Sequence, residues 1–574
     1  MVDLKASPFL LDDQAVRWVE ETYERMDFHQ RVCQLFVDPL QRKNREELKE
    51  FLAKYPICGM SFRGAQFPLE ETQDILRELQ SLAPIPYLIA CDTESGASGA
   101  LRGGTFIASG AQAGAADDPD VAYHVTASAA TEIHAAGYNW SFGAIGDPLL
   151  NWRNTLINTR SYGSDTDKVI RCCEGFIRGF EENNMVSCLK HFPGDGWEER
   201  DQHLVIANNG LSCEEWDAIY GKIYSHFIEK GVKSIMVGHF TLPAYQRKLN
   251  PTLADRDMMP ACLSPELIDG LLRKQLGYNG LVMTDQTMML GYYAMKRSDA
   301  VVQSIVSGID IVLGINDAEE DIEAMKAGIL DGRISQQRLK DALYRILGTK
   351  AAIGLHRLQA EGKLVPPPEA LEVVGCEKHR RWAVEASDSA ITLVKDRNNQ
   401  LPIRPETHKR LFVNFIGIDN SRSMMGLGIT TNGDAGAREI VRAKLEEAGF
   451  EVHMYEETGR FSPKGKTKEF AEKYDAALIF ADFTGFATTN SIRINWGAPM
   501  SPGCPWYEPE VPTAFISLNY TNHMLDVPRV PIFINAYNDR DYTIELVVKK
   551  LMGDSPFRGS YDETVWCGMW DTRL

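Results

Sequence analysis

Between about Phe51 and Leu313 the chain alternates short apolar runs with longer amphipathic stretches, and this alternation constrains the fold more than any other feature. Each run is rich in β-branched or aromatic residues and is bounded by Gly or Pro, which is typical of buried strands. The runs are PYLIACD, GYNWSFGAI, MVSCLKHF, VKSIMVGHF, NGLVMTD and SGIDIVLG. Repeated strand-then-helix units over about 300 residues predict an α/β fold, a (β/α)8 barrel with its helices outside. A doubly wound parallel sheet is the alternative.

Polar residues follow several of these runs at the point where each predicted strand ends. They are Asp92, Lys190, His191, His239 and Asp285. In a barrel of this kind the carboxyl ends of the strands and the loops after them carry the chemistry. One such residue alone is more often the cap of the next helix. Several at equivalent ends of different strands favour a shared site.

The second half of the chain predicts a separate α/β unit. The helical segment SQQRLKDALYRILGTKAAIGL closes the first domain, and a connector with three consecutive prolines follows it. We expect a barrel domain over residues 1–355, a linker over 356–385 and an αβα sandwich domain over 386–574. A loop of the second domain with Trp496, Trp506 and Tyr507 favours a protein interface and a sugar platform equally.

The charge and composition of the chain restrict the classes of molecule that it is expected to bind. Its net charge of −18 repels nucleic acid and anionic lipid, so we expect neither as a partner. The N-terminus lacks a cationic segment followed by an apolar one, and we expect a cytoplasmic protein. Eleven cysteines without a Cys-x-x-Cys pair indicate reduced, mostly buried thiols. No ligand spacing for a metal recurs, and we expect neither a metal nor another cofactor.

The stretch KHFPGDG, followed after four residues by Asp201-Gln202-His203, resembles a signature of glycoside hydrolase family 3, in its β-N-acetylglucosaminidase branch. There Lys-His-Phe-Pro-Gly-His-Gly precedes Asp-Ser-His at this spacing. The likeness continues in order along the chain. It includes MDFHQRVCQLFV, LIACDTESG, NTRSYG, GYNGLVMTDQTMM, SGIDIVL, SDSAITLVKDRNNQLPI and GDSPFRG, the last two resembling the entry and exit of a second domain common in the family.

The resemblance implies a retaining, exo-acting hydrolase that releases terminal β-linked N-acetylglucosamine through a glycosyl ester. Asp285 matches the nucleophile, and Asp201 with His203 matches a dyad that supplies the general acid and base. Asp92, Arg160, Lys190 and His191 match residues that bind sugar hydroxyls. A carboxylate nucleophile and a proton donor are what retention requires. The expected partner is a small carbohydrate, and the second domain is expected to give support or to form a homodimer.

The chain departs from the family pattern at three places. Asp195 replaces the histidine between the two glycines, Gln286 replaces the acid after the nucleophile, and the Arg after the Asp-x-Glu-Gly-Gly stretch is absent. Substrate preference is therefore open to alternatives: a β-glucosidase, a phosphorylase of N-acetylglucosaminides, and, from a different class, a non-catalytic sugar-binding protein. A histidine acid favours phosphorolysis because, when neutral, it repels an incoming phosphate less than a carboxylate would.

Overall fold

The computed structural model describes residues 2–40, 44–62, 67–417, 436–456, 466–485, 487–496 and 503–574. The chain divides into two compact units. The first consists of Met1–Phe106, Ala122–Pro148 and Val169–Arg380, and the second of Ile107–Val121, Leu149–Lys168 and Arg381–Leu574. In the described ranges, no helix combines the length and the apolar character needed to cross a membrane.

The first unit contains eight parallel strands that form a closed ring. One sheet has the order β10-β1-β2-β3-β4 and another the order β5-β7-β9. Parallel bridges join the two sheets at both ends, from Trp140 to Val186 and from Met283 to Ile311. The strands are β1 (Phe36–Asp38), β2 (Gly59–Ser61), β3 (Leu88–Cys91), β4 (Trp140–Ser141), β5 (Cys188–Phe192), β7 (Ser234–Val237), β9 (Leu281–Thr284) and β10 (Val312–Leu313). The closed ring confirms the predicted α/β barrel and excludes the doubly wound sheet.

Helices alternate with these strands, as the sequence periodicity predicts. Polar N-terminal residues start several of them: the Ser335 side chain accepts a hydrogen bond from the backbone N–H of Arg338 at the start of α13. Helix α11 ends at Gly308, whose φ of 117° suits glycine and where a Cβ would lie 2.8 Å from Ile268. The helices are α1 (Asp13–Arg25), α2 (Phe28–Cys33), α3 (Arg45–Lys54), α4 (Leu69–Leu82), α6 (Pro119–Ala136), α7 (Thr166–Glu181), α8 (Cys213–Trp216), α9 (Lys222–Lys230), α10 (Pro243–Leu249), α11 (Arg297–Ser307), α12 (Ala318–Leu330), α13 (Gln336–Ala352) and α14 (Leu355–Ala360), with a π-helical segment at Glu266–Gln275 and a short strand pair, β6 (Ala207–Asn208) and β8 (Phe240–Thr241). Helix α15 (Glu377–Ala390) follows them and belongs mostly to the second unit.

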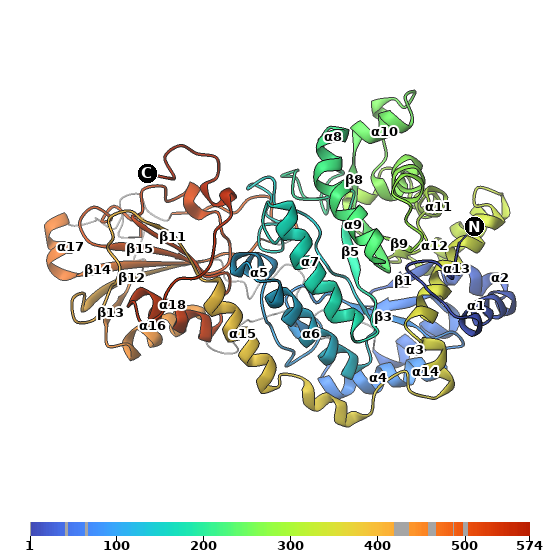
Figure 1. Cartoon of the computed structure of the whole chain (residues 1–574), viewed down its shortest axis with the longest axis horizontal. Coiled ribbons are helices and arrows are strands. Elements are labelled where there is room, and N and C mark those ends of the chain that lie inside the picture. Colours follow the sequence, from blue (N-terminus) through green and yellow to red (C-terminus); the bar gives the residue numbers. More distant parts are fainter. Residues whose placement is uncertain are drawn as a thin grey trace. The chain divides into compact units, whose positions relative to one another are not determined.

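The second unit is built on a six-stranded sheet of order β11-β16-β15-β14-β12-β13, in which only the β11–β16 pair is antiparallel. Alternate residues of each strand face opposite sides: Leu411 and Val413 pack with α16 and α18, and Phe412 packs with α17 (Figure 1). This arrangement confirms the predicted αβα sandwich. Its elements are α5 (Gly110–Ala116), β11 (Thr392–Asp396), β12 (Arg410–Gly417), α16 (Ala437–Glu447), β13 (Glu451–Met454), α17 (Thr467–Lys473), β14 (Ala476–Asp482), β15 (Thr513–Ser517), β16 (Ile532–Asn535) and α18 (Asp541–Leu551).

The aromatic loop singled out in the second unit is mostly part of its core. Tyr507 is fully buried and stacks on Phe470 with ring centroids 4.7 Å apart, and Trp506 packs edge-on against the same ring. Trp496 is half-buried. Residues 497–502 of this loop lie outside the described residues. Tyr507 is therefore not available as a sugar platform or as an interface residue.

A buried histidine of the second unit should make its stability depend on pH. His523 is fully buried among Phe483, Phe515 and Tyr520, and neither ring nitrogen has a hydrogen-bond partner among the described residues. Burial lowers its pKa to about 4, from an ordinary value near 6.5. Below pH 6.5 the unfolded chain binds a proton that the folded chain does not, so the free energy of unfolding falls as pH falls towards 4. Between pH 7 and pH 5 we expect a loss of about 2 kcal/mol from this group.

Urea unfolding of this unit at both pH values measures the loss. The variant His523→Leu should remove most of that pH dependence, because it removes the group whose pKa differs between the folded and unfolded states. An unchanged difference between pH 7 and pH 5 in the variant would show that His523 is not the cause.

Candidate active site

The strongest candidate for a nucleophile is Asp285, which directly follows the fully buried strand β9. Its backbone N–H donates to the carbonyl of Val237 at the end of β7, over 2.8 Å, so its position is set by the barrel. Its two carboxylate oxygens have different neighbours. Oδ1 accepts from the backbone N–H of Gln286 at 2.7 Å, and Oδ2 accepts from the side-chain amide of Gln202 at 3.2 Å.

Asp285 is held as an anion. Burial by itself raises the pKa of this carboxyl, since only 7% of the residue is exposed. The positive forms of His191, His239 and His203 act in the opposite direction, and the net pKa is about 2. Among these three histidines, His191 has its Nε2 atom 4.0 Å from Asp285 Oδ2. A buried carboxylate that stays ionised is suited to nucleophilic attack.

Asp201 and His203 form a hydrogen-bonded pair on the loop after β5. The Nδ1–H of His203 donates to Asp201 Oδ1 over 2.7 Å, and the backbone N–H of His203 donates to the same oxygen over 2.8 Å. Asp201 is buried, whereas the His203 side chain is 27% exposed. With Nδ1–H fixed on the carboxylate, Nε2 is the nitrogen left to exchange a proton.

Lys190 and His191, both in β5, are buried and each is held by carboxylates of other strands. Lys190 Nζ lies 2.7 Å from Glu94 Oε1 and 3.4 Å from Asp92 Oδ1, and both of these residues follow β3. Such pairing offsets the cost of burying an ammonium group. The structure thus brings Asp92, Lys190 and His191 into the same unit as Asp285, Asp201 and His203.

Asp147 is a buried residue of the site that sequence reasoning missed. Its carboxylate accepts from the Nδ1–H of His191 at 2.7 Å and from the backbone N–H groups of His191 and Asp195. These contacts fix the His191 ring with Nε2 towards Asp285. The only sequence signal was its place just after the apolar run GYNWSFGAI.

His239 follows β7 and contacts the residue next to the nucleophile. Its Nε2–H donates to the carbonyl of Gln286 over 3.1 Å, which leaves Nδ1 to accept from the thiol of Cys262 at 3.2 Å. Burial lowers the pKa of His239, although Asp285 opposes this shift. A neutral ring with both nitrogens occupied supports neighbouring groups and has no spare site for a substrate proton.

Asp195, Gln286 and Arg160 have different surroundings from the residues above. Asp195 is buried, and its side chain accepts from the backbone N–H of Gly196 over 2.6 Å. Gln286 places its side-chain oxygen against Gly314, where no described residue donates to it. Arg160 is half-buried and belongs to the second unit, so its predicted role in sugar binding stays a prediction.

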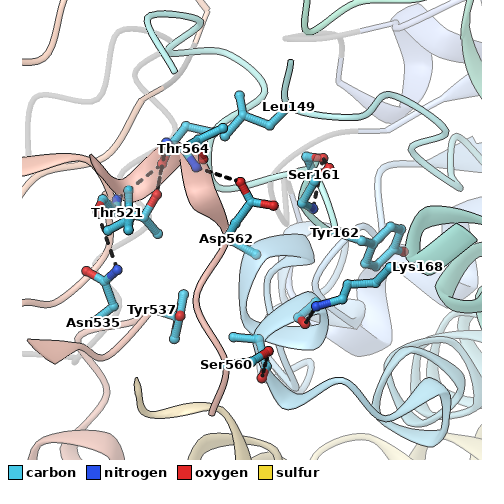
Figure 2. A pocket seen from close by; sticks show the side chains of 16 residues that line it. Leu149, Ser161, Tyr162, Lys168, Thr521, Asn535, Tyr537, Ser560, Asp562 and Thr564 are labelled. Carbon is cyan, nitrogen blue, oxygen red and sulfur yellow. Dashed lines mark hydrogen bonds between the residues drawn. The ribbon is translucent and has the colours of Figure 1, made fainter. Parts of the chain in front are cut away.

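A pocket within the second unit gathers a different set of side chains (Figure 2). Several of its polar groups are bonded to one another: Asp562 accepts from the backbone N–H of Thr564 over 2.9 Å, and Asn158 pairs with Thr521. Its lining contains none of the residue pairs that position a nucleophile beside a proton donor. In the described part of the chain, no three His, Cys, Asp or Glu side chains are arranged to bind a metal ion.

A model of the glycosyl hydrolase family 3 N-terminal domain matches residues 25–349, which is more than half of the chain. The chain belongs to glycoside hydrolase family 3. This confirms the family predicted from the sequence motifs, and the protein is a glycoside hydrolase.

Two known proteins are similar to this chain over essentially its whole length. A β-N-acetylglucosaminidase/β-glucosidase of Cellulomonas fimi is 36% identical over 576 residues, which cover 100% of both chains. The solved structure of the β-glucoside phosphorylase BglX is 33% identical, with a TM-score of 0.91 and 99% of each chain covered. A family 3 β-N-acetylglucosaminidase of Paenibacillus sp. str. FPU-7 shares the fold, with a TM-score of 0.73, 22% identity, and coverage of 93% of this chain and 98% of that one.

Proposed function

We propose that this family 3 protein is a retaining, exo-acting glycosidase that releases terminal β-linked N-acetylglucosamine. Asp285 is the nucleophile in this proposal, and His203, held by Asp201, is the general acid and base. The observation that carries the proposal is a buried, ionised carboxylate directly after β9, next to a loop whose histidine is fixed by its own carboxylate at 2.7 Å. These are the two groups that a double displacement needs.

In the first step an Asp285 oxygen attacks the anomeric carbon of the substrate. The bond between that carbon and the oxygen of the departing group breaks, and His203 Nε2–H gives its proton to that oxygen. In the second step neutral His203 accepts a proton from water as the water attacks the same carbon. The ester bond breaks, the carboxylate of Asp285 is restored, and two inversions leave the configuration unchanged.

The sugar ring would be held by the charged pairs beside the nucleophile. Lys190 and Asp92 can each bind ring hydroxyls, and His191 presents Nε2 towards the same place as Asp285. Buried polar groups of this kind reject a sugar that leaves them unpaired. Arg160 is assigned to the same task through the family resemblance.

Phosphorolysis is a second candidate, and a specific observation favours it. The proton-transfer residue of the proposed second step is a histidine, which is neutral at that stage and does not repel an incoming phosphate. A solved relative at 33% identity is named a β-glucoside phosphorylase. A phosphate oxygen would then replace water, needing no proton removal, and the product would be a sugar 1-phosphate.

Turnover of p-nitrophenyl β-N-acetylglucosaminide and of the matching glucoside, each with and without phosphate, tests both candidates. We expect the acetamido substrate to be at least about tenfold faster in kcat/KM. Release of free N-acetylglucosamine, unaffected by phosphate, supports hydrolysis. Acceleration by phosphate with formation of a sugar 1-phosphate supports the second candidate.

Two other outcomes would contradict the proposal. Faster turnover of the glucoside would show that the protein is a β-glucosidase, and N-acetylglucosamine would then not be its preferred sugar. Binding of the sugar without any turnover of either substrate would make it a non-catalytic sugar-binding protein.

A further inference from the structure

Gln202 lies between the two residues of the proposed dyad, yet its side chain points away from them and towards the nucleophile. The residue is only 1% exposed. Its Oε1 atom accepts from the backbone N–H of His239 over 2.7 Å, and its Nε2 atom donates to Asp285 Oδ2 over 3.2 Å. Because a backbone N–H can only donate, the oxygen of the amide must face His239. The amide therefore has its NH₂ group fixed towards the carboxylate.

The backbone of the same loop is bound to the segment that follows the nucleophile. The backbone N–H of Leu290 donates to the carbonyl of His203 over 2.9 Å, and that of Gly291 donates to the carbonyl of Gln202 over 3.1 Å. A Cβ on Gly291 would lie 2.5 Å from the Gln202 carbonyl oxygen, so this close approach requires glycine. The side-chain hydrogen bond from Gln202 to Asp285 joins this loop directly to the charge of the nucleophile.

We propose that Gln202 is a positioning residue, which holds the acid/base loop against Asp285 while that side chain is an anion and loosens its hold when Asp285 becomes a glycosyl ester. The inference rests on the proposed function. A hydrogen bond to a carboxylate is roughly twice as strong as one between neutral groups, and forming the ester removes the charge. His203 is thus held for the first step, and the loop is freer to admit an acceptor for the second.

Hydrogen exchange of the substrate-free, full-length protein tests the attachment itself. In Gln202→Ala the amides of Leu290 and Gly291 should exchange about tenfold faster or more, because a bond to a charged group is lost. In Asp285→Asn, which keeps an acceptor but removes the charge, they should exchange faster by a smaller factor. Unchanged exchange in either variant would overturn the proposal.

Gln246 offers a matched control in the same unit. It is also fully buried, and its amide bonds to Leu242, Met259 and Ser264 at a distance from the dyad in sequence. Gln246→Ala should leave exchange at Leu290 and Gly291 unchanged. Faster exchange there in this control would mean that loss of any buried glutamine loosens the loop, and the specific role of Gln202 would be refuted.

Kinetics with different leaving groups separates positioning from a general structural defect. Gln202→Ala should lose more activity on a phenyl glycoside, which needs a proton donor, than on a dinitrophenyl glycoside, which does not. Gln246→Ala should reduce both rates by the same factor. Equal losses on the two substrates in Gln202→Ala would contradict the proposed positioning of His203.

Gln202→Glu gives a pH signature that a purely structural role would not produce. The introduced carboxylate would oppose Asp285 and would regain a donor only when protonated, so its activity relative to Gln202→Ala should rise as pH falls. The titratable groups facing this amide are Asp285 after β9, His191 in β5, His239 after β7 and the Asp201–His203 pair. These groups are present in both variants, so the ratio of the activity of Gln202→Glu to that of Gln202→Ala reports the titration of the introduced carboxyl alone. A ratio that does not change with pH would count against the proposal.

The two proposals can fail separately. Exchange is measured without substrate, so an unaltered loop in Gln202→Ala refutes the role of Gln202 whatever the enzyme catalyses. Inactivity of the unaltered protein towards glycosides refutes the proposed function and leaves the exchange result in place.

Discussion

Asp285→Ala is expected to lower kcat/KM for the preferred aryl glycoside by about 10⁴-fold or more, with little change in the unfolding temperature. The reason is that Asp285 directly follows a barrel strand and that three histidines lower the pKa of its carboxyl to about 2, which keeps it an anion. Without it the anomeric carbon has no nucleophile for the first displacement. Steady-state rates and a thermal melt measure the two quantities.

Trapping the covalent intermediate tests the role of Asp285 without a measurement of rates. A 2-fluoro glycoside slows the second step, so the unaltered protein should gain the mass of one glycosyl group on the peptide that contains Asp285. The alanine variant should gain none. Label on a different carboxylate would place the nucleophile elsewhere.

The proposed acid gives a contrasting pattern in the same assays. His203→Ala should lose several orders of magnitude on poor leaving groups and far less on a dinitrophenyl glycoside, because the latter departs without a proton. His226 provides a control: it is 30% exposed and pairs with Glu174 on the outside of the same unit. His226→Ala should retain nearly full activity on both substrates. If His203→Ala were equally active, the proton donor would be another residue, and a second-unit carboxylate would be the next to test.

The general position of the candidate site could be predicted from the sequence because parallel strands end on one side of a ring. Asp92, Lys190, His191 and Asp285 each follow or end an apolar run, and closing the ring brings those ends together. The spacing of Asp201 and His203 likewise permitted the contact that the structure shows at 2.7 Å. The first inference depends on local pattern and on the known architecture of a barrel. The role of the Asp201–His203 pair came from the resemblance to the family, and its spacing only allowed the contact.

The partners of these residues could not be predicted in the same way. Asp147 is 44 residues from His191, and Gln202 is 83 residues from Asp285. Whether a side chain after a strand turns towards a given neighbour depends on packing in three dimensions, which no periodicity records. Tyr507 illustrates the opposite case, since an aromatic in a Gly- and Pro-rich loop suggested exposure and is instead stacked on Phe470 in a core.

The largest stability effect is expected from Asp310, a fully buried carboxylate surrounded by guanidinium groups. It accepts from Arg273 at 2.6 Å and lies 3.3 Å from Arg345, and Arg338 also donates to it. Burial raises the pKa of Asp310, but the three cations reverse this and lower it below the ordinary value. Asp310→Asn leaves all three arginines without a carboxylate partner among the described residues, and the free energy of unfolding should fall by about 3–5 kcal/mol.

The exposed pair of Asp299 and Arg333 is the matched control for this prediction. Both side chains are about half exposed, so Asp299→Asn should cost less than about 1 kcal/mol. Urea unfolding of both variants measures the difference, and a loss in Asp310→Asn no larger than in the control would show that the buried cluster is not a main source of stability.

Asp310 also contacts the strand that precedes the nucleophile. Asp310 accepts from the backbone N–H of Val282 in β9, three residues before Asp285, at 3.0 Å. An Asp310→Asn protein that still folds should therefore lose kcat more than its folded fraction accounts for, because the strand that carries the nucleophile loses a charged anchor. Activity that falls only in proportion to the folded fraction would confine Asp310 to a role in stability.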